Sequence, residues 1–340
     1  MRGKTISHAL RLVVAAGLII CTSGSVSAKA QITPFDPSGS IGTYPWEANA
    51  DGSVVGFWYN GNDAVTRAFI RAPDGTITSF DNDGSRVTAA YGINHKNVTT
   101  GYWTNLQGNF PGFIRQPDGM MDIFHAPGDD NGTYPIGITD KGTVAGFYYD
   151  LYAVPHGFIR TPHGKISTFD AEGDGYGTLP ISINASNVVT GHYGDDNMVW
   201  HGFVRDAAGT LTSFDPPGAG TGTFAQSINA TGVIAGYFGD ANNVYHAFVR
   251  AADGTITSFD HKGSIGTFAN SVNDNGEVAG YYEDSANRAH GLLRTADGKL
   301  KTFDVPGAAG TYPNNINNKG LVTGWYTDSG GYYHGFVRGK

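Results

Sequence analysis

A glycine in the pattern G-x-V-x-G-x-Y recurs at a nearly constant spacing along the whole chain, and this repeat constrains the fold more than any other feature. Arginines ending the related pattern H-G-F-V-R recur in step with it. A fixed period of this length indicates copies of one supersecondary unit that must pack on their neighbours. The glycines are Gly56, Gly101, Gly146, Gly191, Gly236, Gly280 and Gly324, separated by 45, 45, 45, 45, 44 and 44 residues, and the arginines are Arg71, Arg115, Arg160, Arg205, Arg250, Arg294 and Arg338.

Each copy divides into four short runs rich in β-branched and aromatic residues. In the fifth copy these runs are residues 225–229, 233–238, 245–250 and 255–260. Short links that contain glycine separate the first run from the second and the third from the fourth, as β-hairpins require. Four antiparallel strands in about 45 residues are typical of a propeller blade.

The two ends of the chain indicate how the array closes. The seventh copy stops after Arg338 without its fourth strand, whereas an extra S-F-D-like segment with Phe35 and Asp36 precedes the first copy. Phe35 lies 45 residues before Phe80, in register with the fourth strands. We therefore predict an all-β, seven-bladed β-propeller over residues 31–340, with four antiparallel strands per blade and the N-terminal strand closing the last blade. Closure would remove the exposed sheet edges of an open array.

Residues 1–30 are typical of a secretory signal peptide. Basic residues precede an apolar stretch at 12–20 that is too short to span a membrane, and Ala28-Lys29-Ala30 fits a small-x-small cleavage site. We expect a secreted protein, periplasmic or extracellular. Cleavage would remove four basic residues and no acid from a chain whose formal net charge is already -8, and would also remove Cys21, the only cysteine. Such acidity argues against nucleic acid as a partner. No later segment is long and apolar enough for membrane insertion, and we expect a monomer.

An aromatic pair ends the second strand of most copies, next to long links where binding sites commonly lie. Aromatic faces beside carboxylates and amides suit sugar rings, although most such rings in a propeller fill the space between blades. The predicted ligand-binding residues are Trp58, Trp103, Tyr148, Tyr193, Tyr282 and Tyr326.

A histidine at the start of the third strand lies 14 residues before the aspartate that ends the fourth. These two strands are antiparallel across a short turn, so the two side chains should be cross-strand neighbours. We interpret them as a structural clasp, because near-identical pairs lack the asymmetry of catalytic acids and bases. The pairs are His156 with Asp170, His201 with Asp215, His246 with Asp260, His290 with Asp304, and His334 with Asp36.

Other groups give no strong indication of chemistry. The recurring arginines are expected to be solvated or paired with nearby acids. We predict no catalytic residue, no metal site and no cofactor. If the chain were an enzyme, its chemistry should lie where the copies diverge, as at Glu47, where other copies have Gly, Ser or Asn.

The repeat at residues 228–260, with the triplet His246-Ala247-Phe248, resembles the extracellular HAF-repeat family of bacteria. The resemblance covers nearly all of residues 31–340 and implies a secreted or surface repeat protein. That family offers no activity or catalytic residue to transfer. The leading functional hypothesis is a non-catalytic binding module for a glycan or a cell-surface protein. The alternatives are a polysaccharide lyase or glycosidase, and a purely structural or assembly protein.

Overall fold

The computed structural model describes residues 30–340, apart from 62, 83 and 105–107. The predicted signal peptide therefore lies almost entirely outside the described residues. Residues Gln31–Lys340 form one compact unit. The described residues form strands and turns, and no helix long and apolar enough to cross a membrane occurs among them.

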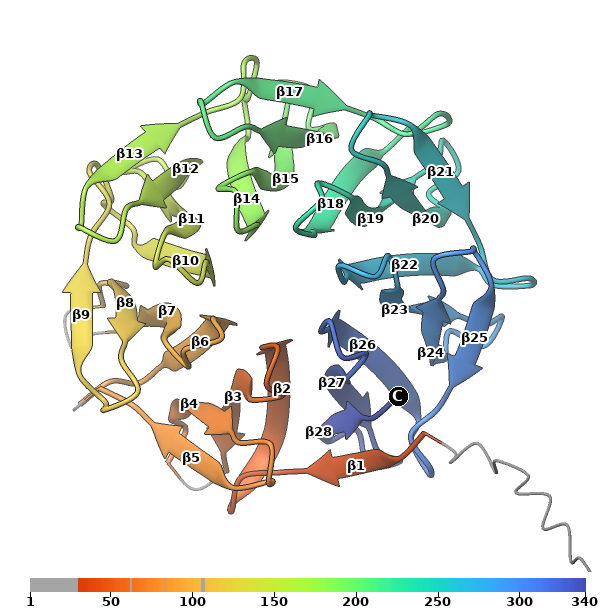
Figure 1. Ribbon diagram of the computed structural model, residues 1–340, viewed down its shortest axis with the longest axis horizontal. Coiled ribbons are helices and arrows are strands. Elements are labelled where there is room, and N and C mark those ends of the chain that lie inside the picture. The colour runs from red at the N-terminus through yellow and green to blue at the C-terminus, as the bar shows by residue number, and fades with distance from the viewer. Residues whose placement is uncertain (1–29, 62, 83, 105–107) are drawn as a thin grey trace, which may run out of the picture. The chain divides into compact units, whose positions relative to one another are not determined.

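The strands fall into four-stranded antiparallel groups arranged around a central axis (Figure 1). In chain order the groups are β2 (Ser40–Ala48), β3 (Val54–Asn60), β4 (Thr66–Arg71) and β5 (Ile77–Phe80); β6 (Thr88–Ile93), β7 (Thr99–Trp103), β8 (Gly112–Arg115) and β9 (Met121–Phe124); β10 (Thr133–Ile138), β11 (Val144–Tyr149), β12 (Pro155–Arg160) and β13 (Ile166–Phe169); β14 (Gly177–Ile183), β15 (Val189–Gly194), β16 (Trp200–Arg205) and β17 (Leu211–Phe214); β18 (Gly222–Ile228), β19 (Ile234–Gly239), β20 (Tyr245–Arg250) and β21 (Ile256–Phe259); β22 (Gly266–Val272), β23 (Val278–Glu283), β24 (Ala289–Arg294) and β25 (Leu300–Phe303). The remaining strands are β26 (Gly310–Ile316), β27 (Val322–Thr327) and β28 (Tyr333–Arg338), with β1 (Ile32–Phe35) from the other end of the chain.

Strand β1 occupies the place of a fourth strand beside β28. The two strands pair antiparallel from Ile32 with Arg338 to Phe35 with Gly335. The pairing of β24 with β25 has the same register, from Arg294 with Leu300 to Gly291 with Phe303. A further parallel bridge joins Gly42 of β2 to Tyr333 of β28. The first and last copies of the repeat are therefore side by side.

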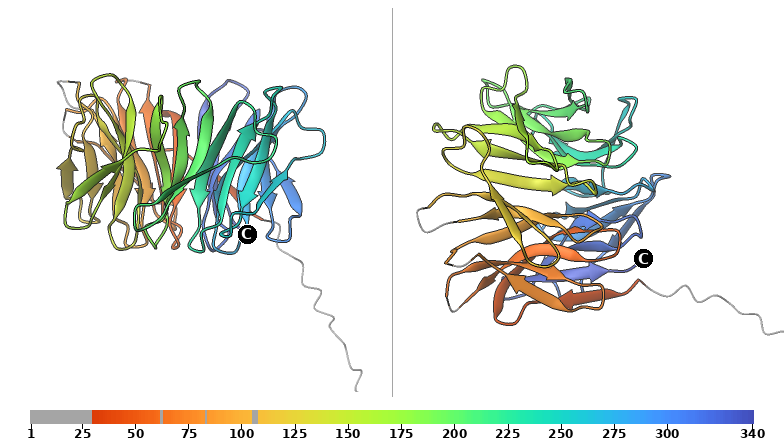
Figure 2. Two further views of the ribbon diagram at one scale, coloured as in Figure 1. Left: turned by 90° about the horizontal axis from the view of Figure 1, so that it is seen from above. Right: turned by 60° about the vertical axis from the view of Figure 1, so that its left-hand side comes forward.

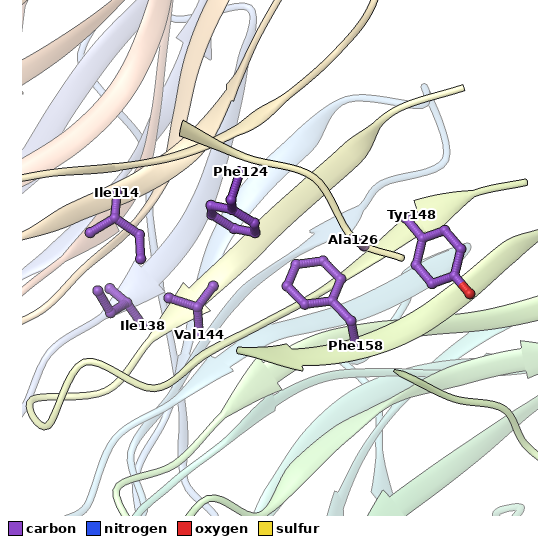
Figure 3. Close-up of a cluster of buried hydrophobic side chains, with 7 residues drawn as sticks. All are labelled: Ile114, Phe124, Ala126, Ile138, Val144, Tyr148 and Phe158. Carbon is purple, nitrogen blue, oxygen red and sulfur yellow. The ribbon is translucent and has the colours of Figure 1, made fainter. Parts of the chain in front are cut away.

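The hydrophobic core lies between neighbouring groups. The third strand of each group contributes one side chain that is almost completely buried: Phe69, Phe113, Phe158, Phe203, Phe248, Leu292 and Phe336. Figure 3 shows one cluster, in which Ile114 and Phe124 of one group meet Val144, Tyr148 and Phe158 of the next. Burial of each phenylalanine stabilises the fold by about 2–3 kcal/mol, so each group depends on its neighbours.

The recurring glycine is required by a close backbone approach. The first strand of each group contains a β-bulge, as between Ala225 and Ser227 of β18. A Cβ atom on Gly236 would overlap the carbonyl oxygen of Phe224 in the strand next to it. Side chains larger than hydrogen are therefore excluded there, and the same clash recurs at the equivalent glycines of the other copies.

The strands run between two opposite faces of this unit (Figure 2). Within a group, the first and third links are tight turns, such as 49–53 and 72–76, and both lie on what we call the short-turn face. The second link and the link to the next group lie on the opposite face, which we call the long-link face after the links between groups. The expectation that the second links are also long is wrong, because most of them, such as 195–199 and 240–244, are five-residue turns with the same hydrogen bonds as 49–53.

Candidate functional site

A central cavity of about 320 Å³ lies among the first strands of the groups, toward the short-turn face. Its lining residues come from the ends of β2, β6, β10, β14, β18, β22 and β26 and from the turns that follow them. The cavity is therefore at the opposite end of the strands from the long links, where sequence reasoning placed the binding site.

The wall of this cavity is asymmetric, although it is built by a repeat. At one level the copies place Trp46, Tyr91, Ile136 and Ile181 on four consecutive groups. At the same level the next three groups place Gln226, Asn270 and Asn314. An aromatic and aliphatic wall therefore faces a wall of amides.

Trp46 is 37% exposed and lies at the bulge of its strand. The register of β2 against β3 shifts between Pro45 and Glu47, so Trp46 has no direct partner in the ladder. Its ring meets that of Tyr91 edge to face, with the centroids 4.8 Å apart. This pair presents a large apolar surface to the cavity.

Two amides of the opposite wall are oriented by the backbone of the next group. The Nδ2 atom of Asn270 donates to the carbonyl of Pro313 at 2.9 Å, and that of Asn314 donates to the carbonyl of Trp46 at 3.0 Å. Within the described part of the chain, the side chain of Gln226 makes no hydrogen bond. The amide wall therefore has polar atoms in place for a ligand.

Glu47 lies at the next level of the wall and bonds to the neighbouring group. Its Oε2 atom accepts the backbone N–H of Ile93 at 3.0 Å. Burial raises the pKa of Glu47 to about 7, against the effect of this bond and with a contribution from Asp140. The equivalent bonds in other copies are made by Ser182 with Ile228, Ser227 with Val272, Ser271 with Ile316, and Asn315 with Ala48. The Glu47 carboxylate thus accepts the backbone hydrogen bond between groups that a serine hydroxyl or the Asn315 amide accepts elsewhere. The two copies after it have glycine at the position of Glu47, namely Gly92 and Gly137.

A ring of asparagines surrounds the cavity at the short-turn face. Each Nδ2 atom donates to the backbone carbonyl of the next group, and each Oδ1 atom accepts N–H groups of its own turn. The ring bonds are Asn49 to Asn94, Asn94 to Thr139, Asn184 to Asn229, Asn229 to Asn273, Asn273 to Asn317, and Asn317 to Asn49. Thr139 replaces the asparagine of the third copy. The sequence signal was the Asn that ends nearly every first strand, and sequence reasoning gave it no role.

The predicted ligand-binding aromatics lie elsewhere, toward the long-link face. Trp58, Tyr148 and Tyr193 are buried, and thus have no ring face free for a sugar, which corrects their interpretation as ligand contacts. Packing between groups covers them, as expected for most propeller aromatics. Trp103, Tyr282 and Tyr326 are only partly buried. Tyr282 and Tyr326 stack on His290 and His334, with centroids 4.9 and 5.0 Å apart.

The predicted histidine–aspartate pairs all lie within hydrogen-bond distance. The Nδ1 atoms of His156, His201, His246, His290 and His334 are 2.9, 2.7, 2.8, 2.9 and 2.7 Å from Asp170, Asp215, Asp260, Asp304 and Asp36. Sequence reasoning missed a second carboxylate near each Nε2 atom, at 3.2–3.8 Å, from Asp150, Asp195, Asp240, Asp284 and Asp328. Burial lowers the pKa of His290, but hydrogen bonds to Asp304 and Asp284 outweigh it and raise this pKa. No group of three or more His, Cys, Asp or Glu that could hold a metal ion is found in the described part of the chain.

The recurring arginines stack on the neighbouring group, which corrects the expectation that they are solvated or locally paired. Each guanidinium carbon lies 4.5–5.0 Å from the ring centroid of a phenylalanine on the preceding fourth strand. Such cation–π contacts contribute about 0.5–1 kcal/mol each where they are partly exposed. The pairs are Arg71–Phe35, Arg115–Phe80, Arg160–Phe124, Arg205–Phe169, Arg250–Phe214, Arg294–Phe259 and Arg338–Phe303.

Comparison with known proteins defines the class of fold. No protein-family model matches this chain, and no curated protein is similar to it in sequence. A streptogramin B lyase structure superposes with a TM-score of 0.62 at 15% identity, covering 92% of this chain and 98% of the other. Virginiamycin B lyase from Staphylococcus aureus gives 0.61 at 13%, covering 91% and 99%. The β-propeller domain of the Trilobed protease from Pyrococcus furiosus gives 0.57 at 10%, covering 87% and 95%. The chain is therefore an all-β propeller protein, and at these identities the likeness shows the fold alone.

Proposed function

We propose that the protein is a seven-bladed propeller, closed by β1, that acts as a non-catalytic carbohydrate-binding module through its central cavity. The observation that carries this proposal is the two-part wall, with Trp46 and Tyr91 in one part and Gln226, Asn270 and Asn314 in the other. Closure is supported by the pairing of β1 with β28 and by the Asn317–Asn49 bond of the asparagine ring.

The two walls match the two kinds of surface on a sugar ring. A pyranose has a C–H face that packs on an aromatic side chain, and a periphery of hydroxyl groups that bond to amides. The cavity volume of about 320 Å³ lies at the lower end of the range for small-molecule sites. A short saccharide segment or the end of a glycan chain fits this description better than a bulky ligand.

The amide wall is ready to bind without large rearrangement. Asn270 and Asn314 are held by backbone carbonyls, so their orientation is set before a ligand arrives. Pre-organised polar groups lose little entropy on binding, which raises affinity. Gln226 supplies a side chain that has no competing bond within the described residues.

The test is a glycan-array screen of residues 31–340, followed by calorimetry on the best ligand with Trp46→Ala and Gln226→Ala. Each variant is expected to lose about tenfold in affinity, because Trp46→Ala removes the most exposed ring of one wall and Gln226→Ala removes an amide with no competing bond from the other. The matched control is Met120→Ala, which truncates an exposed side chain on the β8–β9 turn. Full affinity in both cavity variants would refute the cavity as the glycan site.

Product release should be monitored on the same glycans, because the main rival is a polysaccharide lyase or glycosidase. Glu47 is the residue that such chemistry would use, and its Oε2 atom is engaged by Ile93. We propose that Glu47 connects two groups and does not catalyse a reaction. Turnover that is lost in Glu47→Gln would reverse this assignment.

A protein partner is the second candidate, and one observation favours it. Large apolar side chains are exposed on the second links of the groups, including Leu151, Tyr152, Met198 and Tyr332. Exposed apolar residues that gather on one face are typical of interaction surfaces. A glycan screen without any ligand, together with capture of a cell-surface protein that Tyr152→Ser abolishes, would support this candidate instead.

We also propose that the chain is a secreted HAF-repeat protein whose leader, residues 1–30, is removed. The resemblance of residues 228–260 to that family supports this location. N-terminal sequencing of the protein recovered from the periplasm or medium is expected to begin at Gln31. A cytoplasmic product that retains Met1 would contradict the proposal.

A further inference from the structure

We propose that the cavity prefers a sugar that carries a free, protonated amine, with the Glu47 carboxylate and the rings of Trp46 and Tyr91 forming the amine subsite. This inference rests on the proposed carbohydrate-binding function and names its ligand class: oligomers of glucosamine in preference to neutral glycans.

The charges of the cavity favour a cation. The charged side chains among its lining residues are Glu47, Asp140 and Asp274, and the lining contains no lysine or arginine. Asp140 is paired with the ring of His95 at 2.5 Å, and Asp274 bonds to Asn318 and to the backbone of Ala230 at the rim. Glu47 is therefore the carboxylate inside the wall that no cationic side chain neutralises.

Glu47 also has one oxygen available. Its Oε2 atom accepts the N–H of Ile93, and its Oε1 atom has no hydrogen bond with any described residue. Gly92 and Gly137 take the place of serine on the next two strands, so neither of these copies repeats the bond. Oε1 is therefore the oxygen that a substituent of a sugar could reach.

The aromatic pair joins the same two groups as the Glu47 bond: Trp46 of β2 meets Tyr91 of β6, and Glu47 of β2 bonds to Ile93, two residues further along β6. An ammonium group bonded to a carboxylate and lying against an aromatic face gains a cation–π contact as well as a charge-assisted hydrogen bond. A neutral hydroxyl or acetamide group at the same position gains neither in full.

The electrostatics around Glu47 give the preference a pH dependence. Burial raises the pKa of Glu47 to about 7, so a fraction of the empty sites is protonated near neutral pH. Asp140 after β10 contributes to this shift, and the other titratable groups that line the cavity are Tyr91 and His95 at the β6 end and Asp274 after β22. An amine should bind less tightly as the pH falls from 7 to 5.5, because Glu47 gains a proton over this interval while the amine stays protonated, whereas a neutral glycan should not lose affinity.

The test is calorimetry with three probes of equal length: a glucosamine hexamer, an N-acetylglucosamine hexamer and a cello-hexaose. The wild-type protein is expected to bind the glucosamine hexamer at least tenfold more tightly than the others near pH 7. Glu47→Gln, which keeps an acceptor for Ile93, should remove this difference. The charge-matched control is Glu277→Gln, because Glu277 lies in the β22–β23 turn outside the cavity and bonds to Asn273 and Lys340.

The outcomes separate the two proposals. Equal or tighter binding of the neutral hexamers, or an amine preference that survives in Glu47→Gln, overturns the amine subsite and leaves carbohydrate binding in place. A preference lost equally in Glu277→Gln would assign it to general surface charge and also overturns the subsite. Failure of all three hexamers, and of every glycan in the array, refutes both proposals.

Discussion

Replacement of Asn229 by alanine tests whether the asparagine ring links neighbouring groups. The Nδ2 atom of Asn229 donates to the carbonyl of Asn273 at 3.0 Å, and its Oδ1 atom accepts the N–H groups of Thr231 and Val233. Asn229 is 5% exposed, so its lost partners would be left with little access to water. At about 1 kcal/mol for each net hydrogen bond and more for a buried orphan, Asn229→Ala should lower the free energy of unfolding by about 2–4 kcal/mol.

A second variant separates the link between groups from the turn. Threonine takes the place of this asparagine at Thr139, where its hydroxyl oxygen still accepts the N–H of Thr143 at 3.1 Å. Asn229→Thr should therefore keep part of the turn and lose the bond to Asn273, at a cost of about 1–2 kcal/mol. Urea denaturation followed by far-UV circular dichroism gives both values. A cost below about 0.5 kcal/mol for alanine, or an equal cost for both variants, would refute this reasoning.

Three further perturbations test the contacts between strands and groups. His290→Gln should destabilise the protein by up to about 1 kcal/mol near pH 6. The pKa of His290 in the folded state is raised above 6.5, so the difference from wild type should shrink as the pH rises through this folded-state pKa. A difference in stability that does not change with pH would contradict the clasp. Arg250→Met keeps an aliphatic side chain but removes the guanidinium that lies over the ring of Phe214. The free energy of unfolding, followed by thermal melting, should fall by about 0.5–1 kcal/mol. An unchanged melting temperature would argue against the cation–π contribution. Phe35→Ala and its matched variant Phe303→Ala should each lower the free energy of unfolding, measured in urea, by about 2–4 kcal/mol. A negligible effect of Phe35→Ala alone would mean that β1 is not an integral fourth strand.

The repeat allowed the strands, their hairpins and the His–Asp pairs to be predicted from the sequence. This worked because those contacts are local: His246 and Asp260 are 14 residues apart on adjacent antiparallel strands, and register alone brings them together. The N-terminal segment was likewise placed by its register with Phe80.

Contacts between copies were harder to predict because the pattern of one copy does not contain them. Arg250 stacks on Phe214 of the preceding group, and Asn229 bonds to Asn273 of the following one. The location of the cavity was also missed, since its lining comes from the ends of all the first strands and the turns after them, which only the arrangement of the groups around one axis brings together. Long links suggested the opposite face, although the divergence of the copies at Glu47 did mark the cavity wall.

The most direct test of carbohydrate recognition by the cavity is a crystal structure of residues 31–340 with the tightest-binding hexasaccharide. The account predicts a sugar ring in the cavity, packed on Trp46, bonded to Asn270 or Asn314, and with its amine beside the Glu47 carboxylate. A glycan bound on the long-link face, at Trp103 or Tyr282, with the central cavity empty, would contradict it.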